Sequence, residues 1–401
     1  MTDPAATERL LAAPGVAPDR RGLRTEVTDW GPDGPARWRA ARQAMRPALT
    51  GDRVAEFLPA VVAETERLTA RWPATGVITA RHEATRLTAA VNTHLVLGPP
   101  TPATAAVSDL VSAELTLGAR RPSWWRSSSR LLRAQRRTYA ALRRLVRDTE
   151  PRALHAVLLD AGLDEHTVVL SLRTMLLSGH RVPAAALAWA WHELAEHPAA
   201  QSRADAEADE ATGVAAPDAA VGGAEVGVAE AGVAEAGAAE AAAGVTDADG
   251  AATGVAGLPF CRAVLHEAMR LHPPVSYFQR LLTEPVTVAG HALPADALVR
   301  FTPAVNHRDP TAYADPDAFR PERWLGPPPR PGNYLPFALG PRICPGSGVA
   351  LAELSTALAT ILTSHHLRPH RRPREPGPEL PHSPRGLRLL VHRRRRGVSP
   401  P

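Results

Sequence analysis

The stretch from Phe337 to Gly346, FALGPRICPG, places one cysteine in a tight turn directly before a run of good helix formers. A cysteine at such a position faces the positive end of the helix dipole and amides that have no partner within the helix. These surroundings favour the thiolate over the thiol. Pro345 has no N–H, so the first amide donors come from Gly346 onward, where a ligand can approach the backbone closely. This chemistry suits a buried thiolate that holds a metal.

Five positions of the stretch fit the long and specific pattern F-x-x-G-x-R-x-C-x-G, namely Phe337, Gly340, Arg342, Cys344 and Gly346. In this pattern the chain resembles the haem-binding loop of the cytochrome P450 family. A lone cysteine is more often an ordinary buried thiol. Five matched positions favour a haem ligand instead. The resemblance implies one haem b whose iron is ligated by Cys344.

The resemblance covers about residues 36–391 apart from one insert, and it implies a mainly α fold with small β-sheets. We expect residues 1–35 to form a short irregular N-terminal segment and 36–203 to form the helical part of the domain. Residues 258–401 should supply the helix called K, the β region, the haem-binding loop and the helix called L. Residues 204–257 form a low-complexity acidic insert built from near-repeats such as GVAEAG. The insert has frequent glycines and no aromatic side chain, so we expect it to be disordered.

Three further positions match the residues that hold the haem propionates in the family. Trp38 and Arg42 lie one turn apart on a helix expected over 36–49, and Arg280 lies on a short strand. On its own W-x-x-x-R is a weak signal, because an arginine on a solvated face is common. Together with Cys344 the resemblance assigns Trp38, Arg42, Arg280 and Arg342 to the propionates.

A buried ion-pair network is implied by Glu267 and Arg270, which match the family's E-x-x-R, and by Arg323 in FRPERW. An exposed pair at this spacing contributes only a few tenths of a kcal/mol. The resemblance implies instead a three-residue network that braces the loop carrying the cysteine.

The longest apolar helical pattern, from Glu165 to His197, should be the central helix that crosses the haem. The family usually has an acid and an alcohol there, which relay protons to bound dioxygen. This chain has Arg181 and Val182 at those positions, and we expect Gly179 and Val182 to face the distal side. The proton chemistry must therefore differ from that of the family.

Composition restricts the partners. All 46 basic residues are arginine, and the net charge is +5. Between residues 204 and 261 there are 11 acidic residues and no basic one, so the rest of the chain is strongly basic. The arginines are spread along the chain with few aromatics among them, which favours an acidic protein partner over nucleic acid. The two cysteines, Cys261 and Cys344, form no C-x-x-C pair. No apolar run approaches the roughly 18 residues of a membrane span, so we expect a soluble cytoplasmic protein.

The resemblance implies a monooxygenase that oxidises a small organic substrate, in secondary metabolism, with O2 and electrons from NAD(P)H through a ferredoxin and its reductase. An alternative is a peroxygenase that uses hydrogen peroxide. In the fatty-acid peroxygenase branch of the family an arginine followed by proline replaces the acid and alcohol, and here Arg181 is at the acid position with Val182 between it and Pro183, so the match is partial. A second alternative is a haem-binding partner protein that has lost turnover.

The segment before Trp38 is shorter than in the family. The strands around Arg280 and Val299 should then have an unpaired edge. We expect either coding sequence upstream of Met1 or a weakly stable variant.

Overall fold

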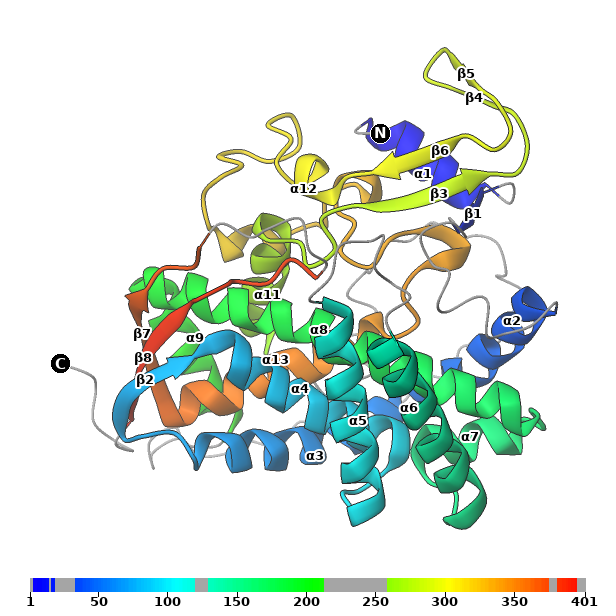
Figure 1. Cartoon of the computed structure of the whole chain (residues 1–401). Coiled ribbons are helices and arrows are strands. Elements are labelled where there is room, and N and C mark those ends of the chain that lie inside the picture. Colours follow the sequence, from blue (N-terminus) through cyan, green and yellow to red (C-terminus); the bar gives the residue numbers. More distant parts are fainter. Residues whose placement is uncertain are drawn as a thin grey trace, which may run out of the picture.

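The structure is a computed structural model, and it describes residues 3–13, 16–18, 33–119, 129–212, 258–374 and 381–394. Most of these residues are helical, and short strands gather at two separate places (Figure 1). The mainly α fold with small β-sheets that the sequence predicts is confirmed.

The helices are α1 (Pro4–Ala12), α2 (Gly34–Met45), α3 (Asp52–Thr69), α4 (Ala80–Leu97), α5 (Pro102–Ala119), α6 (Ser129–Asp148), α7 (Ala153–Asp160), α8 (Glu165–Glu196), α9 (Pro198–Ala211), α11 (Pro259–Leu271), α12 (Pro303–Asn306) and α13 (Ser347–Ser364). Four short 3-10 turns are η2 (Arg46–Leu49), η4 (Pro321–Trp324), η5 (Pro331–Asn333) and η6 (Gly340–Arg342). The strands are β1 (Val16–Pro18), β2 (Thr75–Thr79), β3 (Phe278–Leu282), β4 (Val286–Val288), β5 (His291–Leu293), β6 (Leu298–Phe301), β7 (His365–Arg371) and β8 (Arg388–Arg393).

α8 is the central helix of the main core. It begins at the N-cap Asp164, whose carboxylate accepts a hydrogen bond from the Thr167 N–H at 3.1 Å. α4, α6 and α11 pack against it, and Trp191 is fully buried within it. A run of small residues, Ala184–Ala190 interrupted by Leu187 and Trp189, allows these neighbours to approach closely.

The strands form three antiparallel sheets in the described part of the chain. Their orders are β1-β3-β6, β2-β8-β7 and β4-β5. The first sheet and α1 enclose a second, smaller core, which also receives Leu335 and Leu339 from the segment before the cysteine. This small core therefore connects the N-terminal residues to the loop that contains Cys344.

The N-terminal segment is not irregular as predicted, because residues 3–13 and 16–18 are ordered into α1 and β1. Asp3 caps α1 by accepting from the Ala6 N–H at 2.6 Å, and Leu10 and Leu11 are buried. β1 pairs with β3, with Pro18 opposite Arg280, so the predicted unpaired edge at β3 is wrong. The segment is polar and weakly periodic, so its pattern does not predict a helix. The helix that forms is capped and has its few apolar residues on one side.

The predicted insert begins too early at residue 204, because α9 continues to Ala211. Its acidic residues have specific partners. Glu207 accepts from the N–H groups of Phe260 and Cys261 at 2.6 and 2.7 Å, and Asp209 pairs with Arg394 at 2.6 Å. Glu207 thus caps the N-terminus of α11. The rest of the insert, residues 213–257, lies outside the described residues.

Deleting residues 213–257 and joining the ends with about eight Gly/Ser residues should leave the melting temperature nearly unchanged. Glu207 already holds the start of α11 beside α9, and the free energy of closing a loop changes by only about 0.6 kcal/mol per doubling of its length. Thermal unfolding and haem content are the measurements.

The matched control is the longer deletion of 204–257, which also removes Glu207 and Asp209. This deletion should cost at least about 1 kcal/mol for the lost cap alone. Equal melting temperatures for the two deletions would contradict the role given to Glu207, and loss of haem binding in the shorter one would show that 213–257 is structural.

One helix, α13, is long and apolar enough to cross a membrane by length and composition, which the sequence reading had overlooked. However, 72% of its 18-residue window is buried inside the protein. α3, α9 and α11 pack around it. The core helix of a globular domain is buried to a similar degree. The length and composition of α13 are therefore only weak evidence for a membrane span.

Candidate functional site

The loop from Phe337 to Gly346 is closed by its own backbone hydrogen bonds. The Cys344 N–H donates to the Phe337 carbonyl and the Ile343 N–H donates to the Gly340 carbonyl, both at 2.9 Å. Gly340 has φ +72°, and a Cβ there would overlap the backbone of Leu11 in α1. Glycine is needed at this position both for its conformation and for the close approach of α1. The loop delivers Cys344 three residues before the start of α13.

Cys344 is half-buried, and its surroundings do not favour the thiolate in the way that the sequence predicts. Burial raises the pKa of the Cys344 thiol, and the opposing effects of the Gly346 N–H and of Arg42 are smaller. α13 begins only at Ser347, so the amides of its first turn start beyond Gly346. The predicted preference for the thiolate is therefore wrong for the polypeptide alone, and a metal ion at the sulfur would lower this pKa.

Two of the predicted arginines lie on different sides of this loop. Arg42, on α2, donates to the carbonyl of Ile343, the residue before Cys344. Burial lowers the pKa of Arg42, and the proximity of Cys344 opposes this effect. Arg280, on β3, has its pKa lowered to about 10 by burial and by the positive charge of Arg342 in η6. Arg280 and Arg342 therefore lie close enough for the charge of one to act on the other.

The remaining predicted cofactor residues are near the same loop or on the same helix as Arg42. Trp38 lies one turn before Arg42 and packs against the main core, as does Phe337. Gly346 is the N-cap of α13, and a Cβ there would meet only Val349, at 3.5 Å. A Cβ would therefore fit at Gly346 without displacing a neighbour within the described residues.

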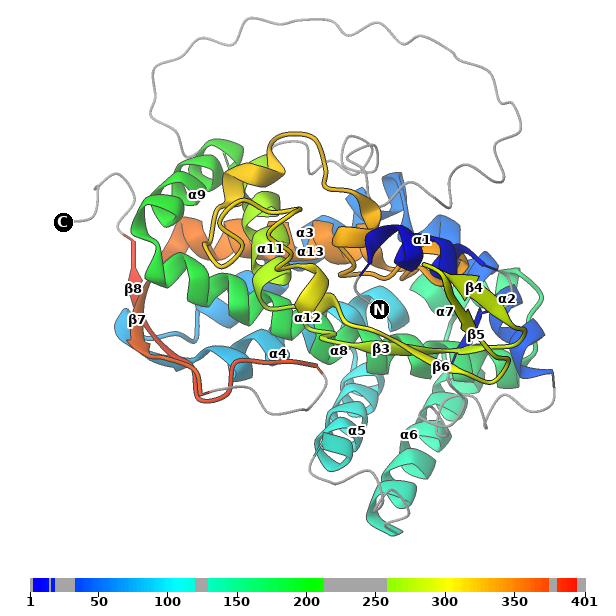
Figure 2. The ribbon, with the colours of Figure 1, turned by 90° about the horizontal axis from the view of Figure 1, so that it is seen from above.

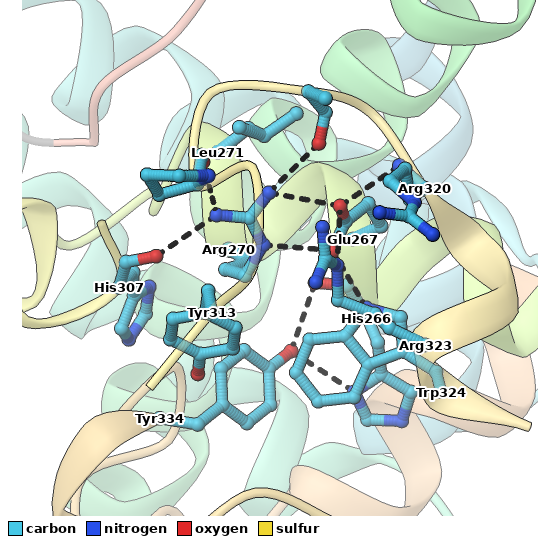
Figure 3. A network of polar contacts seen from close by, with 12 residues as sticks. His266, Glu267, Arg270, Leu271, His307, Tyr313, Arg320, Arg323, Trp324 and Tyr334 are labelled. Carbon is cyan, nitrogen blue, oxygen red and sulfur yellow. Dashed lines mark hydrogen bonds and ion pairs between the residues drawn. The ribbon is translucent and has the colours of Figure 1, made fainter. Parts of the chain in front are cut away.

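The network of Glu267, Arg270 and Arg323 is assembled in the structure (Figure 3). Arg270 donates to both carboxylate oxygens of Glu267 at 2.8 Å, and the exposed fraction of both side chains is 0%. Arg323 Nε and Trp324 Nε1 donate to the same carboxylate at 2.9 and 2.8 Å. The backbone N–H of Arg320 adds a further bond at 2.9 Å. The charge of Glu267 is therefore paired and fully hydrogen-bonded.

The network extends to the segment that leads into the cysteine loop. Arg270 Nη1 donates to the His307 carbonyl at 2.9 Å, and His307 Nε2 accepts from the Leu335 N–H at 2.8 Å. Burial lowers the pKa of His307 to about 3, so the ring is neutral and can accept this bond. Tyr334, the neighbour of Leu335, bonds to His266 of α11 at 2.9 Å. The sequence argument had not included His266 or Tyr334.

The middle of α8 has one face that is more open than the rest of the helix. Ser178 is exposed and Arg181 and Val182 are half-buried, whereas most other residues of α8 are buried. Positions i, i+3 and i+4 share a helix face, so these three side chains lie together. The Ser178 hydroxyl donates to the Thr174 carbonyl at 2.8 Å. Sequence reasoning had weighed Arg181 and Val182 but not this hydroxyl.

Gly179, which the sequence predicts to face the distal side, also has a packing role. A Cβ at Gly179 would overlap the Asn92 side chain of α4. Asn92 is 3% exposed, and its Nδ2 donates to the carbonyls of Met175 at 3.3 Å and Leu176 at 3.0 Å. The absent side chain therefore lets α4 and α8 approach closely.

His180 is a buried polar residue that the sequence argument overlooked. Its Nε2 lies 3.2 Å from the Ser112 hydroxyl of α5, and its carbonyl accepts from the Thr88 hydroxyl of α4 at 2.7 Å. Burial and the neighbouring Arg181 lower the pKa of His180 to about 4, so the ring is neutral at neutral pH. Thr88 and Asn92, four residues apart in α4, are the sequence signal that could have revealed this polar contact.

Comparisons with known proteins agree with these features. The sequence profile described as "Cytochrome P450" matches residues 251–391. Cyclooctatin synthase of Streptomyces melanosporofaciens is 35% identical over 201 residues, covering 49% of this chain and 36% of that protein. A putative cytochrome P450 135B1 of Mycobacterium bovis is 28% identical over 349 residues, covering 81% of this chain and 65% of that protein. The crystal structure of the cytochrome P450DA heme domain superposes with a TM-score of 0.78 at 19% identity, covering all of this chain and 88% of that one. The chain spans only 36–39% of the length of the first curated relatives that it matches.

Proposed function

Because this chain belongs to the cytochrome P450 family, we propose that it is a haem-thiolate monooxygenase that oxidises a small organic substrate with O2. The observation that carries the proposal is the position of Cys344, in a closed loop beside the guanidinium of Arg42. Relatives named cyclooctatin synthase and cyclooctat-9-en-7-ol 5-monooxygenase, both of Streptomyces melanosporofaciens, support a role in secondary metabolism.

The residues present fit haem b. A thiol in a closed loop and several guanidinium groups around that loop are a suitable donor set for an iron with carboxylate substituents. The absent side chain of Gly346 would let a flat group approach the backbone beside the sulfur closely. We assign Cys344 as the iron ligand, Trp38, Arg42, Arg280 and Arg342 to the propionates, and Phe337 and Gly340 to shaping the loop.

When bound, the haem supplies the chemistry by which one oxygen atom of O2 enters a C–H bond. The protein must deliver protons to the distal side and exclude bulk water. Val182 can neither donate nor accept a proton, so we assign this role to the polar groups on the same face, Arg181 and the Ser178 hydroxyl. Electrons would come from NAD(P)H through a ferredoxin and its reductase in the cytoplasm, and the excess of arginine in the folded part suits a small acidic carrier.

Substitutions on the open face of α8 should change how efficiently electrons are used. Val182→Thr should lower the peroxide released per NAD(P)H, because it adds a hydroxyl beside that of Ser178. Arg181→Ala and Ser178→Ala should both raise it, since each removes a polar group that can hold a water. A general acid or base typically contributes about 10²- to 10⁴-fold to the rate, so a partial loss should already be visible in the rate of product formation. Product and peroxide per NAD(P)H consumed are the measurements, with a substrate chosen by its shift of the haem spectrum.

The matched control is Ser171→Ala, which removes a serine of α8 with the same backbone contact, its hydroxyl donating to the Thr167 carbonyl at 2.6 Å, but in a fully buried position. It should leave the peroxide ratio unchanged.

Tight coupling that survives all three open-face substitutions would contradict the assignment. Turnover with hydrogen peroxide but not with the reduced carrier would favour the peroxygenase alternative, for which Arg181 is the supporting residue. No turnover with either would favour a haem-binding partner protein.

A further inference from the structure

The outer surface of α6 carries an unusual concentration of arginine. The helix has seven arginines and one acidic residue, Asp148, in twenty positions. All seven arginine side chains are exposed. Figure 2 shows α5 and α6 projecting side by side from the body of the protein. This basic face is separate from Cys344 and its loop, and no residue of α6 has a role of its own in the proposed function.

The arginines form two adjacent rows along the helix. At 100° per residue, one row contains Arg130, Arg133, Arg137 and Arg144, and the other contains Arg136, Arg143 and Arg147. The first row extends over about 21 Å at 1.5 Å per residue. The opposite side of the helix, which includes Leu142 and Leu145, is buried toward α5 and α8. The rows are therefore held in a fixed orientation by the packing of the apolar side.

Only part of this charge is neutralised by the rest of the described chain. Arg143 and Arg147 pair with Glu165 at 2.9 and 2.7 Å. Arg130, Arg136, Arg137 and Arg144 have no ion pair with any acidic side chain in the described ranges. With respect to the described ranges, these four guanidinium groups therefore keep donors for carboxylates of a partner.

We propose that the arginine rows of α6 bind an acidic protein partner that presents a row of carboxylates, most simply along a helix. The planar guanidinium can donate two parallel bonds to a carboxylate. An anionic membrane is a poorer fit, because a helix that lies in a lipid surface inserts its apolar side, and the apolar side of α6 is buried in the protein. Leu132 is the one large apolar side chain exposed on the described part of the helix. Nucleic acid is also a poorer fit, because Tyr139, the aromatic side chain of α6, is half-buried and its hydroxyl lies 2.6 Å from His166 Nδ1, so the ring is not presented for bases to stack on.

The test uses the full-length protein and two helical peptides of about 20 residues and identical composition. In one peptide the glutamates repeat at three- and four-residue spacings, so that they line one face, and in the other they are distributed around the helix. The first peptide should bind more tightly, and added salt should weaken its binding. The substitutions Arg130→Gln, Arg136→Gln, Arg137→Gln and Arg144→Gln together should weaken it about tenfold.

The matched control removes four exposed arginines from other elements, Arg71, Arg81, Arg368 and Arg388, so that the net charge is the same. It should change the affinity by less than about twofold. A double variant, Arg137→Gln with Arg144→Gln, gives an intermediate loss and guards against misfolding of the quadruple variant, which circular dichroism would report. Equal losses in the two quadruple variants, or equal binding of the two peptides, would overturn the proposal. Tighter binding to phosphatidylglycerol vesicles or to duplex DNA at the same salt concentration would also overturn it.

Discussion

Cys344→Ser should remove the thiolate signature from the spectrum of the reduced carbon monoxide complex, the largest functional effect that we expect from one substitution. An alcohol is far too weak an acid to replace a thiolate as an anionic ligand, and even the thiol of Cys344 has its pKa raised by burial. Haem affinity should fall together with the signature. The position of the Soret band and the amount of haem retained after gel filtration are the measurements.

Cys261→Ala is the matched control, because Cys261 is the other free cysteine in the described structure and is fully buried in α11. Its thiol lies near Glu207 and away from the loop, and burial raises its pKa. This variant can lose stability but should keep the thiolate signature. An unchanged Soret band in Cys344→Ser would rule out Cys344 as the ligand.

Glu267→Ala should destabilise the fold by about 3–5 kcal/mol, because it leaves a buried guanidinium without its charge partner. Arg270 is 0% exposed, and Arg323 donates to the same carboxylate. Removing Glu267 also leaves the Trp324 indole N–H without its acceptor. The free energy of unfolding from urea titration, in the haem-loaded and haem-free protein, is the measurement.

Glu56→Ala provides the comparison with an exposed ion pair. Glu56 pairs with Arg53 at 3.0 Å, and both side chains are more than 60% exposed. Its loss should cost no more than about 1 kcal/mol. A similar small loss for Glu267→Ala would show that the network does not brace the loop.

The sequence predicted those features in which chemistry restricts the choice of residue at fixed spacing. The pattern around Cys344, the pair Glu267 and Arg270, and the distribution of helices all belong to this class, since each depends on residues close together along the chain. The assembled network also depends on Arg323, whose approach to Glu267 could be anticipated only through the resemblance.

Features that arise from packing between distant segments could not be read from the sequence. α1 was predicted to be irregular because its apolar side is short, and its order depends on contacts with η5 and η6 far along the chain. The packing role of Gly179 depends on Asn92, which belongs to another helix. The protonation of Cys344 was predicted wrongly because the cost of burial depends on the whole fold rather than on the adjacent helix.

The contact between α1 and the cysteine loop has a consequence for the order of events during synthesis. Glu8 pairs with Arg330 at 2.8 Å across a separation of 322 residues, and Leu11 packs on Gly340. At about 5–20 residues per second, a ribosome needs on the order of 15 to 60 seconds to make the partners of α1. During that time the segments against which the apolar side of α1 packs in the folded protein have not yet been synthesised. The loop that positions Cys344 is therefore completed only after most of the chain has emerged, and we expect haem to be captured after translation rather than during it.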